Sequence, residues 1–377
     1  MRRNASSEAA KVVEVKEAPA PAPAVTRYLL RFDGYREPVP FIGKKTNRAE
    51  ARFYRDVAPR IPRLLPGCWL HHVSPDWSWL VLGDVPAHRP AAAWIGEDVE
   101  KLLALLASFH GTFWQEDLQD EYPWLTAALA LPHDEARTYG QLKAWHYWDR
   151  VAGHGVALSP HALRSAGVLA PAFIRAAAGL EVMRRLGGWP GIFDQRHAEA
   201  VGELLDDPVP MLQPLRELPA TLLHGDLSLH HWRLSLLDGR RLLDWRNVKV
   251  GPPLWDLVDF LEHLALLRRQ RPDGDQLPSE ETMIDSYLLR MHVGLSRFDA
   301  RAMRQALPAA FCLHVLTTWL PRFADWFQPF LGSPLTWQSL HSLDDPGLER
   351  VGYGRLAGLR GYLSDLFVRF WHATRAL

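Results

Sequence analysis

Two aspartates in the second half of the chain, Asp226 and Asp244, have the type and spacing that phosphoryl-transfer chemistry needs. Asp226 follows His224 and Gly225 in the segment LLHGDLSLHHW, and Asp244 closes a stretch that reads as a hairpin, WRLSLLDGRRLLDW. Because an antiparallel hairpin returns the chain to its starting point, we expect both carboxylates on the same side of it. One could orient an attacking hydroxyl, and the other could hold Mg²⁺, a hard cation that prefers oxygen ligands.

The residue five positions after Asp226 raises a question about the metal. In the pattern H-x-D-x-x-x-x-N, the asparagine binds a magnesium ion, but this chain has His231 there. Imidazole nitrogen binds Mg²⁺ poorly and Mn²⁺ or Zn²⁺ better. Three alternatives stay open: Asp244 holds Mg²⁺ alone with water, the metal preference shifts, or His231 hydrogen-bonds to Asp226. A zinc site of His224, His230 and His231 is disfavoured, because His224 should point into the core and no thiol is near.

A small β-rich region is predicted at the start of the chain, from segments rich in β-branched and aromatic residues. Residues 47–61 (NRAEARFYRDVAPRI) read instead as a helix that Asn47 can cap, with Glu50 at its third position. The predicted strands are 11–17, 25–32, 38–45 and 78–85, and the proline-rich run 18–24 (APAPAPA) connects the first two.

Helical periodicity dominates from residue 97 onward. Ser159 and Pro160 suit the cap and the first residue of one of these helices. A strand-rich island at 220–245 contains both aspartates. The predicted helices are 97–114, 132–151, 159–186 and most of 254–377, where a loop is expected at 331–352.

These elements predict an α+β fold with two lobes and a ligand in the cleft between them. Residues 1–10 form a tail, 11–85 a small β-rich N-lobe, and 86–96 a hinge or connector. The remaining residues, 97–377, form a large and mainly helical C-lobe that includes the catalytic loop and hairpin at 222–256.

The run from 222 to 261 resembles the aminoglycoside phosphotransferase and choline kinase family, whose members carry H-G-D-x-x-x-x-N, then I-D-W, then G-x-P-x-x-D-L. Here the three motifs appear in that order as HGDLSLHH, LDW and GPPLWDL. The resemblance extends more loosely over about 40–115. It implies a protein-kinase-like fold.

The resemblance also implies roles in catalysis and metal binding for the matching residues. Asp226 would orient or deprotonate the substrate hydroxyl, and His224 would brace its loop. Asp244 would hold the nucleotide-bound Mg²⁺, with His231 at the second metal position and Mn²⁺ as an alternative ion. Asp256 would tie the loop backbone down.

On the nucleotide side, the resemblance implies that Lys44 contacts the α- and β-phosphates with Glu50 as its partner. Lys45 is an alternative, because the phase of the strand is uncertain around Gly43. The cofactor would be ATP or GTP, and its base would meet backbone groups of Leu82, Gly83 and Val85.

The implied activity is transfer of the γ-phosphoryl group to a hydroxyl of a small molecule such as a sugar, an amino alcohol or an aminoglycoside. The acceptor should meet Trp, Tyr and His side chains at 145–148 and at 319, 326 and 337. His231 and the alanine- and proline-rich loop keep open an alternative, a kinase-fold protein that binds nucleotide or ligand with weak or no catalysis.

Composition excludes several other classes. Lys plus Arg and Asp plus Glu are equal, at 43 each, and no basic stripe with interleaved aromatic residues suggests a nucleic-acid partner. Two distant cysteines, Cys68 and Cys312, suit a reducing compartment. No apolar run suggests a signal peptide or membrane span, so we expect a cytoplasmic protein. The oligomeric state cannot be read from the sequence.

Overall fold

The computed structural model describes residues 11–19, 25–85, 88–131, 158–235, 239–271 and 277–377. The chain divides into two compact units. The first comprises Met1–Trp94 and His224–Val248, and the second comprises Ile95–Leu223 and Lys249–Leu377. Most of the segment 222–256 therefore groups with the N-terminal sheet, whereas the sequence predicts it within the helical lobe.

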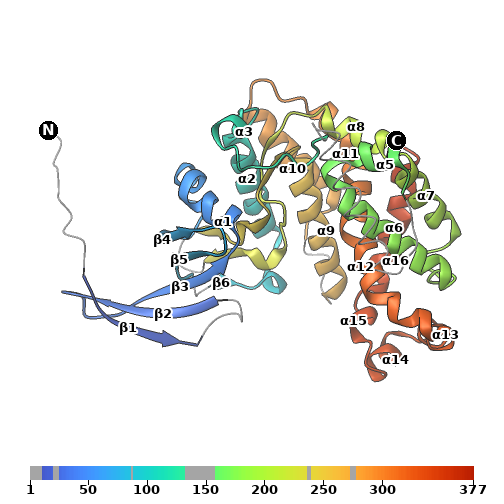
Figure 1. Cartoon of the computed structure of the whole chain (residues 1–377), viewed down its shortest axis with the longest axis horizontal. Coiled ribbons are helices and arrows are strands. Elements are labelled where there is room, and N and C mark those ends of the chain that lie inside the picture. The colour runs from blue at the N-terminus through green and yellow to red at the C-terminus, as the bar shows by residue number, and fades with distance from the viewer. Residues whose placement is uncertain (1–10, 20–24, 86–87, 132–157, 236–238, 272–276) are drawn as a thin grey trace. The chain divides into compact units, whose positions relative to one another are not determined.

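The first unit contains an antiparallel sheet of five strands in the order β1-β2-β3-β5-β4 (Figure 1). Three of these strands confirm the predictions closely: β1 (Val12–Ala18), β2 (Val25–Phe32) and β3 (Val39–Thr46). The fourth predicted strand is β5 (Ser78–Gly83), whose side chains at 78, 80 and 82 are buried. The edge strand β4 (Cys68–Val73) is not predicted, because most of its side chains are exposed and it lacks polar–apolar alternation.

Helix α1 (Arg48–Arg52) begins where the sequence predicts, since the side chain of Asn47 accepts a hydrogen bond from the Glu50 backbone N–H at 2.9 Å. The helical path continues through a π-turn and a 3-10 turn to Arg60. Phe53, which is fully buried, stacks on Trp245 with ring centroids 4.1 Å apart. Stacking of these rings joins the helix to the segment that follows the hairpin.

The predicted hairpin is confirmed as β8 (Trp232–Ser235) paired with β9 (Arg240–Leu242). Gly239 has a φ of +84°, a conformation that glycine adopts without steric cost, and residues 236–238 of the tip lie outside the described ranges. The short strand β6 (His88–Arg89) pairs with β8. Strand β9 ends two residues before Asp244, so Asp244 lies in a turn rather than in a strand.

The second unit is mostly helical, and its short strands β7 (Thr221–Leu223) and β10 (Lys249–Gly251) pair with each other. Helices α6 and α12 pack side by side (Figure 1). The helices are α2 (Gly96–Thr112), α3 (Leu118–Glu121), α5 (Pro160–Ala166), α6 (Ala170–Arg185), α7 (Gln195–Asp206), α8 (Val209–Arg216), α9 (Leu254–Gln270), α10 (Glu280–Gly294), α11 (Ala300–His314), α12 (Leu320–Phe327), α13 (Pro334–His341), α14 (Asp345–Arg350), α15 (Gly354–Ala357) and α16 (Arg360–Thr374).

Two helix predictions need correction. The helix expected at 159–186 begins as predicted, with the Ser159 side chain capping it, but Gly167 interrupts it with a φ of +60°. The loop expected at 331–352 is wrong, because it contains α13 and α14, the latter capped by Asp344. The helix predicted at 132–151 lies outside the described residues.

One helical stretch of the described residues, Pro160–Arg185, is long and apolar enough to cross a membrane by length and composition. Its most apolar window is 67% buried inside the second unit, as expected of a core helix. Both cysteines are free, with Cys312 buried.

Candidate active site

The loop that carries Asp226 is fixed by His224. This side chain is fully buried, and its Nε2 lies 2.9 Å from the backbone oxygen of Leu243, the residue before Asp244. Its ring also meets the Trp245 ring edge-on at 4.7 Å. Gly225 has a φ of +81°, so the chain turns sharply between the two side chains. His224 therefore joins the Asp226 loop to the end of the hairpin, as a bracing residue would.

Asp226 keeps an accessible carboxylate. Its side chain is 39% exposed. The Asn247 amide nitrogen lies 3.5 Å from one of its oxygens, and His231 Nδ1 lies 3.9 Å from the other. Both contacts are long for hydrogen bonds, so the carboxylate can still accept a proton or a hydrogen bond from a substrate.

Asp244 is surrounded by cationic side chains and has a left-handed backbone (φ 68°, ψ 63°). Lys44 Nζ lies 2.8 Å from its Oδ1, and Arg246 donates to both oxygens at 2.6 Å. Burial alone would raise the pKa of Asp244, but hydrogen bonds from His231 and Arg246 and the charge of Lys44 hold it well below its usual value. Asp244 is therefore anionic at any physiological pH.

Lys44 is also paired with Glu50, at 2.8 Å, and the Glu50 side chain is fully buried. The other partners of this carboxylate are the Thr46 hydroxyl and the backbone N–H of Trp245. Lys45 is exposed on the neighbouring position of β3. Of the two lysines that the sequence leaves open, Lys44 is the one that pairs with the carboxylates of Glu50 and Asp244. Its contact with phosphate stays a prediction.

His231 bridges the two aspartates. Its Nδ1 lies 2.9 Å from the backbone oxygen of Asp226, and its Nε2 lies 3.3 Å from Asp244 Oδ2. Burial would lower the pKa of His231, but these hydrogen bonds outweigh burial and raise it. Both ring nitrogens thus face oxygen atoms of the two aspartates, at the positions from which an imidazole would bind a metal. Of the three alternatives from the sequence, this geometry favours the hydrogen bond, which reaches the backbone of Asp226.

These residues fit a Mg²⁺ ion that arrives with a nucleotide. Proteins usually hold such an ion through one or two carboxylates, while phosphate and water complete its shell. Asp244 offers one anionic carboxylate that is 16% exposed. Within the described ranges, no group of three His, Cys, Asp or Glu side chains could hold a metal, which disfavours the zinc alternative.

Two of the three residues predicted to present backbone groups to a base, Leu82 and Gly83, lie within β5. The Gly83 N–H already donates to the backbone oxygen of Gly67 at 2.8 Å, and Leu82 is buried within β5. Only Val85 lies beyond the strand. Asp84, which lies between Gly83 and Val85, forms an ion pair at 2.7 Å with Arg27 on β2. Contact of Leu82, Gly83 and Val85 with a base stays a prediction.

Two residues of this site carry no signal in the sequence motifs. Arg246 and Asn247 follow Asp244 by two and three positions, and each contacts one of the two predicted catalytic aspartates. A charge two positions after an aspartate is common on protein surfaces. The backbone at Asp244 is left-handed, and the Arg246 guanidinium lies against the Asp244 carboxylate.

In the second unit, Asp256 is fully buried, and one of its oxygens lies 3.3 Å from His110 Nε2. His110 Nδ1 in turn lies 2.7 Å from the Tyr287 hydroxyl. These contacts give Asp256 a structural partner within its own unit. Its predicted role toward the loop at 224–226 stays a prediction.

The aromatic residues predicted around an acceptor have different environments. Trp319 and Trp337 are buried, and the Trp337 ring packs edge-on against Phe327. This placement is typical of hydrophobic-core residues rather than of an open pocket. Trp326 is half-buried. Residues 145–148 lie outside the described ranges.

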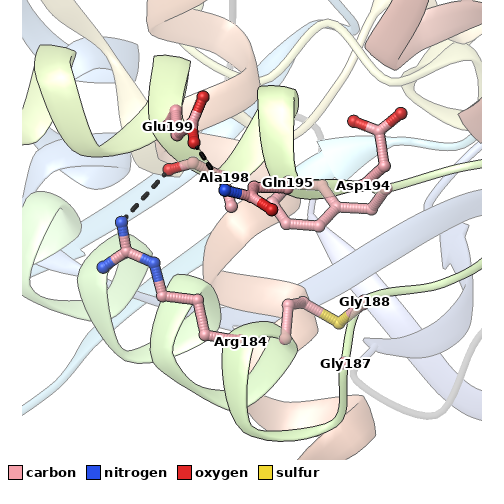
Figure 2. Close-up of a pocket in the computed structure, with 9 residues that line it drawn as sticks. Arg184, Gly187, Gly188, Asp194, Gln195, Ala198 and Glu199 are labelled. Atoms are coloured by element: carbon pink, nitrogen blue, oxygen red, sulfur yellow. Dashed lines mark hydrogen bonds between the residues drawn. The ribbon is translucent and has the colours of Figure 1, made fainter.

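A cavity of about 420 Å³ lies in the second unit, where α6 ends and α7 begins (Figure 2). Polar groups in its lining already pair with one another. Gln195 donates to Glu199 at 2.8 Å, and Arg184 donates to the Ala198 backbone oxygen at 3.3 Å. None of the predicted site residues lines this cavity.

Comparison with known proteins gives one match at the level of sequence families. The model of the phosphotransferase enzyme family (APH) matches residues 23–281. Among curated protein sequences, none matches the chain significantly.

Solved structures to which the chain is similar include an aminoglycoside phosphotransferase from Alicyclobacillus acidocaldarius (12% identity, 95% of this chain and 92% of that chain covered, TM-score 0.46). A choline kinase from Streptococcus pneumoniae is similar at 13% identity, with 90% and 95% covered and a TM-score of 0.43. An ethanolamine kinase from Plasmodium vivax is similar at 10% identity, with 88% and 83% covered and a TM-score of 0.48.

Proposed function

We propose, for a chain that belongs to the phosphotransferase enzyme family, that it transfers the γ-phosphoryl group of ATP or GTP to a hydroxyl of a small molecule. One observation supports this proposal most. Lys44 lies within 2.8 Å of both Glu50 and Asp244, and the same Asp244 is linked through His231 to the loop of the accessible Asp226. Such a set provides a base, a metal ligand and a cation for phosphate.

In this proposal Asp226 orients the acceptor hydroxyl and accepts its proton. The hydroxyl oxygen forms a bond to the γ-phosphorus, the bond to the β–γ bridging oxygen breaks, and the nucleoside diphosphate leaves. Lys44 contacts the phosphates and is held in position by the buried Glu50. Asp244 would hold Mg²⁺, which supplies charge neutralisation at the phosphates.

The proposed acceptor is a small molecule with a free hydroxyl, from the classes of sugars, amino alcohols or aminoglycosides. Relatives named for choline, ethanolamine and aminoglycosides support this range. The equal numbers of acidic and basic residues, 43 each, favour no polyanionic partner. A cytoplasmic location follows for an enzyme that uses ATP or GTP.

The test is transfer of labelled γ-phosphate from ATP and from GTP to a panel of these acceptors. We expect Asp226→Asn to lower turnover by at least about a hundredfold while nucleotide binding persists. A matched control is Asp56→Asn, since Asp56 is a carboxylate of the same unit that pairs with Arg55 and is not among the predicted site residues. Unchanged turnover in Asp226→Asn would show that another residue serves the hydroxyl.

A second candidate function is nucleotide or ligand binding with weak or no catalysis. His231 at the expected asparagine position and the contacts that Arg246 makes with Asp244 favour it. Thermal unfolding with ATP or GTP and with Mg²⁺ or Mn²⁺ separates the two. A nucleotide at a hundredfold excess over its dissociation constant stabilises the native state by about 2.7 kcal/mol. Such a shift without transfer to any acceptor would favour this second function.

A further inference from the structure

We propose that Arg246 is a phosphate-binding residue of this site and competes with divalent cations for Asp244. The inference rests on the proposed function, because it needs a nucleotide to bind beside Lys44. It goes beyond the motif pattern, which assigns nothing to position 246. The consequence is a site in which a side-chain cation performs part of the charge neutralisation that metal ions provide in phosphoryl transfer.

The first observation is the convergence of two cations on one carboxylate. Arg246 Nε and Lys44 Nζ approach the same oxygen of Asp244, at 2.6 and 2.8 Å. Arg246 Nη2 holds the other oxygen at 2.6 Å. This arrangement is a bidentate pair between a guanidinium and a carboxylate. The two positive charges are thereby collected where a triphosphate is expected to lie.

The second observation is that Arg246 retains capacity to bind an anion. Its side chain is 52% exposed, and its contacts use only Nε and Nη2. Over the part of the chain that the structure describes, its Nη1 has no hydrogen-bond partner. A guanidinium has five N–H donors, so those left over can bind phosphate oxygens while the Asp244 pair persists.

The third observation is that the backbone at 246 is anchored. The Arg246 carbonyl accepts a hydrogen bond at 2.9 Å from the amide of Asn47, the residue that caps α1. The preceding residue, Trp245, donates its N–H to Glu50 and stacks on Phe53. The guanidinium therefore extends from a fixed point, which limits the entropy that phosphate binding would cost.

The position that would hold a second metal ion is altered in this chain. His231 replaces the amide that would hold a second metal ion, and its nitrogens face Asp244 and the Asp226 backbone. Arginine remains charged at all physiological pH and matches phosphate geometry. Arg246 thus compensates for the weakened metal site, and at the same time it covers the carboxylate that a free divalent cation would bind.

Two effects of opposite sign follow from removing this side chain. Without Arg246 the site should bind polyphosphate more weakly when no metal is present. It should bind a divalent cation alone more tightly, because Asp244 is uncovered. Removal of a residue that merely stabilises the fold would weaken both polyphosphate binding and divalent-cation binding.

The experiment is calorimetric titration of the full chain, its Arg246→Gln and Arg246→Lys variants, and Arg55→Gln. Arg55 is a matched control, since it forms a similar two-point pair with Asp56 on the surface of the same unit. The probes are ADP, GDP and inorganic tripolyphosphate in EDTA, then Mn²⁺ alone, then each nucleotide with Mg²⁺. Circular dichroism and urea unfolding verify that each variant is folded.

In the absence of metal, we expect Arg246→Gln to lose about tenfold or more in affinity for tripolyphosphate. A similar loss is expected for ADP or GDP, whichever binds the unmodified chain more tightly. The same variant should gain several-fold in affinity for Mn²⁺ alone. Arg246→Lys should recover part of the polyphosphate affinity. Arg55→Gln should have the same affinities as the unmodified chain for every probe.

Equal metal-free affinities in Arg246→Gln and Arg55→Gln would overturn the inference and leave the proposed function standing. A loss of both polyphosphate and Mn²⁺ affinity would also overturn it, because that result indicates a structural role. If the unmodified chain binds no nucleotide with or without Mg²⁺, the proposed function fails and the inference fails with it.

Discussion

The buried carboxylate of Glu50 accepts a hydrogen bond from the backbone N–H of Trp245, 3.0 Å away. Glu50 therefore does more than pair with Lys44. It fixes Trp245, the residue that follows Asp244. The backbone of Asp244 is left-handed and lies outside the paired strands. The Glu50 carboxylate thus joins α1 to the turn after the hairpin. It positions Lys44 directly and Asp244 through the neighbouring Trp245.

We predict that Glu50→Ala destabilises the first unit by about 3 kcal/mol or more, because it leaves Lys44 with one partner fewer and the Trp245 N–H without its acceptor. Glu50→Gln should cost less, since the amide oxygen can still accept from Trp245. Urea unfolding followed by hydrogen exchange at residues 41–57 measures the effect in the unit concerned.

The control for this prediction is Glu14→Ala, which removes a surface carboxylate that pairs with Lys16 and Arg31 on β1 and β2. Exposed ion pairs contribute little, so its unfolding should match that of the unmodified chain. Equal stabilities for Glu50→Ala and Glu14→Ala would mean that the Glu50 hydrogen bonds do not hold the turn.

A second prediction concerns Gly43, which precedes Lys44 on β3. A Cβ there would lie 2.6 Å from the Tyr28 ring and 2.9 Å from the Trp79 ring, and these two rings meet edge-on across the strand. We expect Gly43→Ala to cost about 1–3 kcal/mol in thermal or urea unfolding, because at least one ring must move. Gly34→Ala is not a suitable control because of its positive φ, whereas Gly111→Ala meets open space. A Gly43→Ala protein as stable as Gly111→Ala would show that the rings move freely.

The sequence predicts those parts of the site whose signals are local. Asn47 and Glu50 mark the start of α1 at three-residue spacing, and the hairpin is predicted by two apolar runs around Asp238-Gly239. Capping and tight turns depend on a few neighbouring residues, so a single sequence contains the information. For the same reason the fold class could be inferred from the order of strands and helices.

The remaining parts depend on contacts between distant segments. Lys44 and Asp244 are 200 positions apart, and only the folded chain distinguishes Lys44 from Lys45. Arg246 reaches Asp244 because of one left-handed residue, a conformation that the aspartate itself does not reveal in the sequence. The edge strand β4 escapes prediction because its pairing with β5, rather than burial, defines it.

A third prediction concerns His231→Asn. An amide oxygen suits Mg²⁺ better than imidazole nitrogen does, and the shorter side chain no longer spans Asp226 and Asp244. We expect Mg²⁺-supported transfer to rise about tenfold relative to Mn²⁺-supported transfer, which corresponds to about 1.4 kcal/mol for one added oxygen ligand. Initial rates in titrations of each metal measure this ratio. An unchanged ratio would mean that position 231 does not contact the metal, and His230→Asn serves as the adjacent control.

The last prediction uses His314, which is buried in the second unit on α11. The pKa of His314 is lowered from its ordinary value of 6.5 to about 3, mainly by burial and in addition by repulsion from His263, Arg322 and Arg369. The Asp259 carboxylate lies 3.6 Å from its Nδ1, too far for a good hydrogen bond, so desolvation dominates.

Because the folded-state pKa of His314 is below the unfolded one, the unfolded chain takes up the proton first as the pH falls. The contribution of His314 to stability is thus complete above pH 6.5 and declines steadily toward pH 3. At pH 5 the loss is about 2 kcal/mol, from 1.36 kcal/mol per pH unit. The difference in unfolding free energy between pH 7.5 and pH 5 should shrink by that amount in His314→Gln. It should persist in His161→Gln, where the histidine is 59% exposed. Parallel pH profiles for all three proteins would show that His314 is charged, or accessible to water, in the folded state.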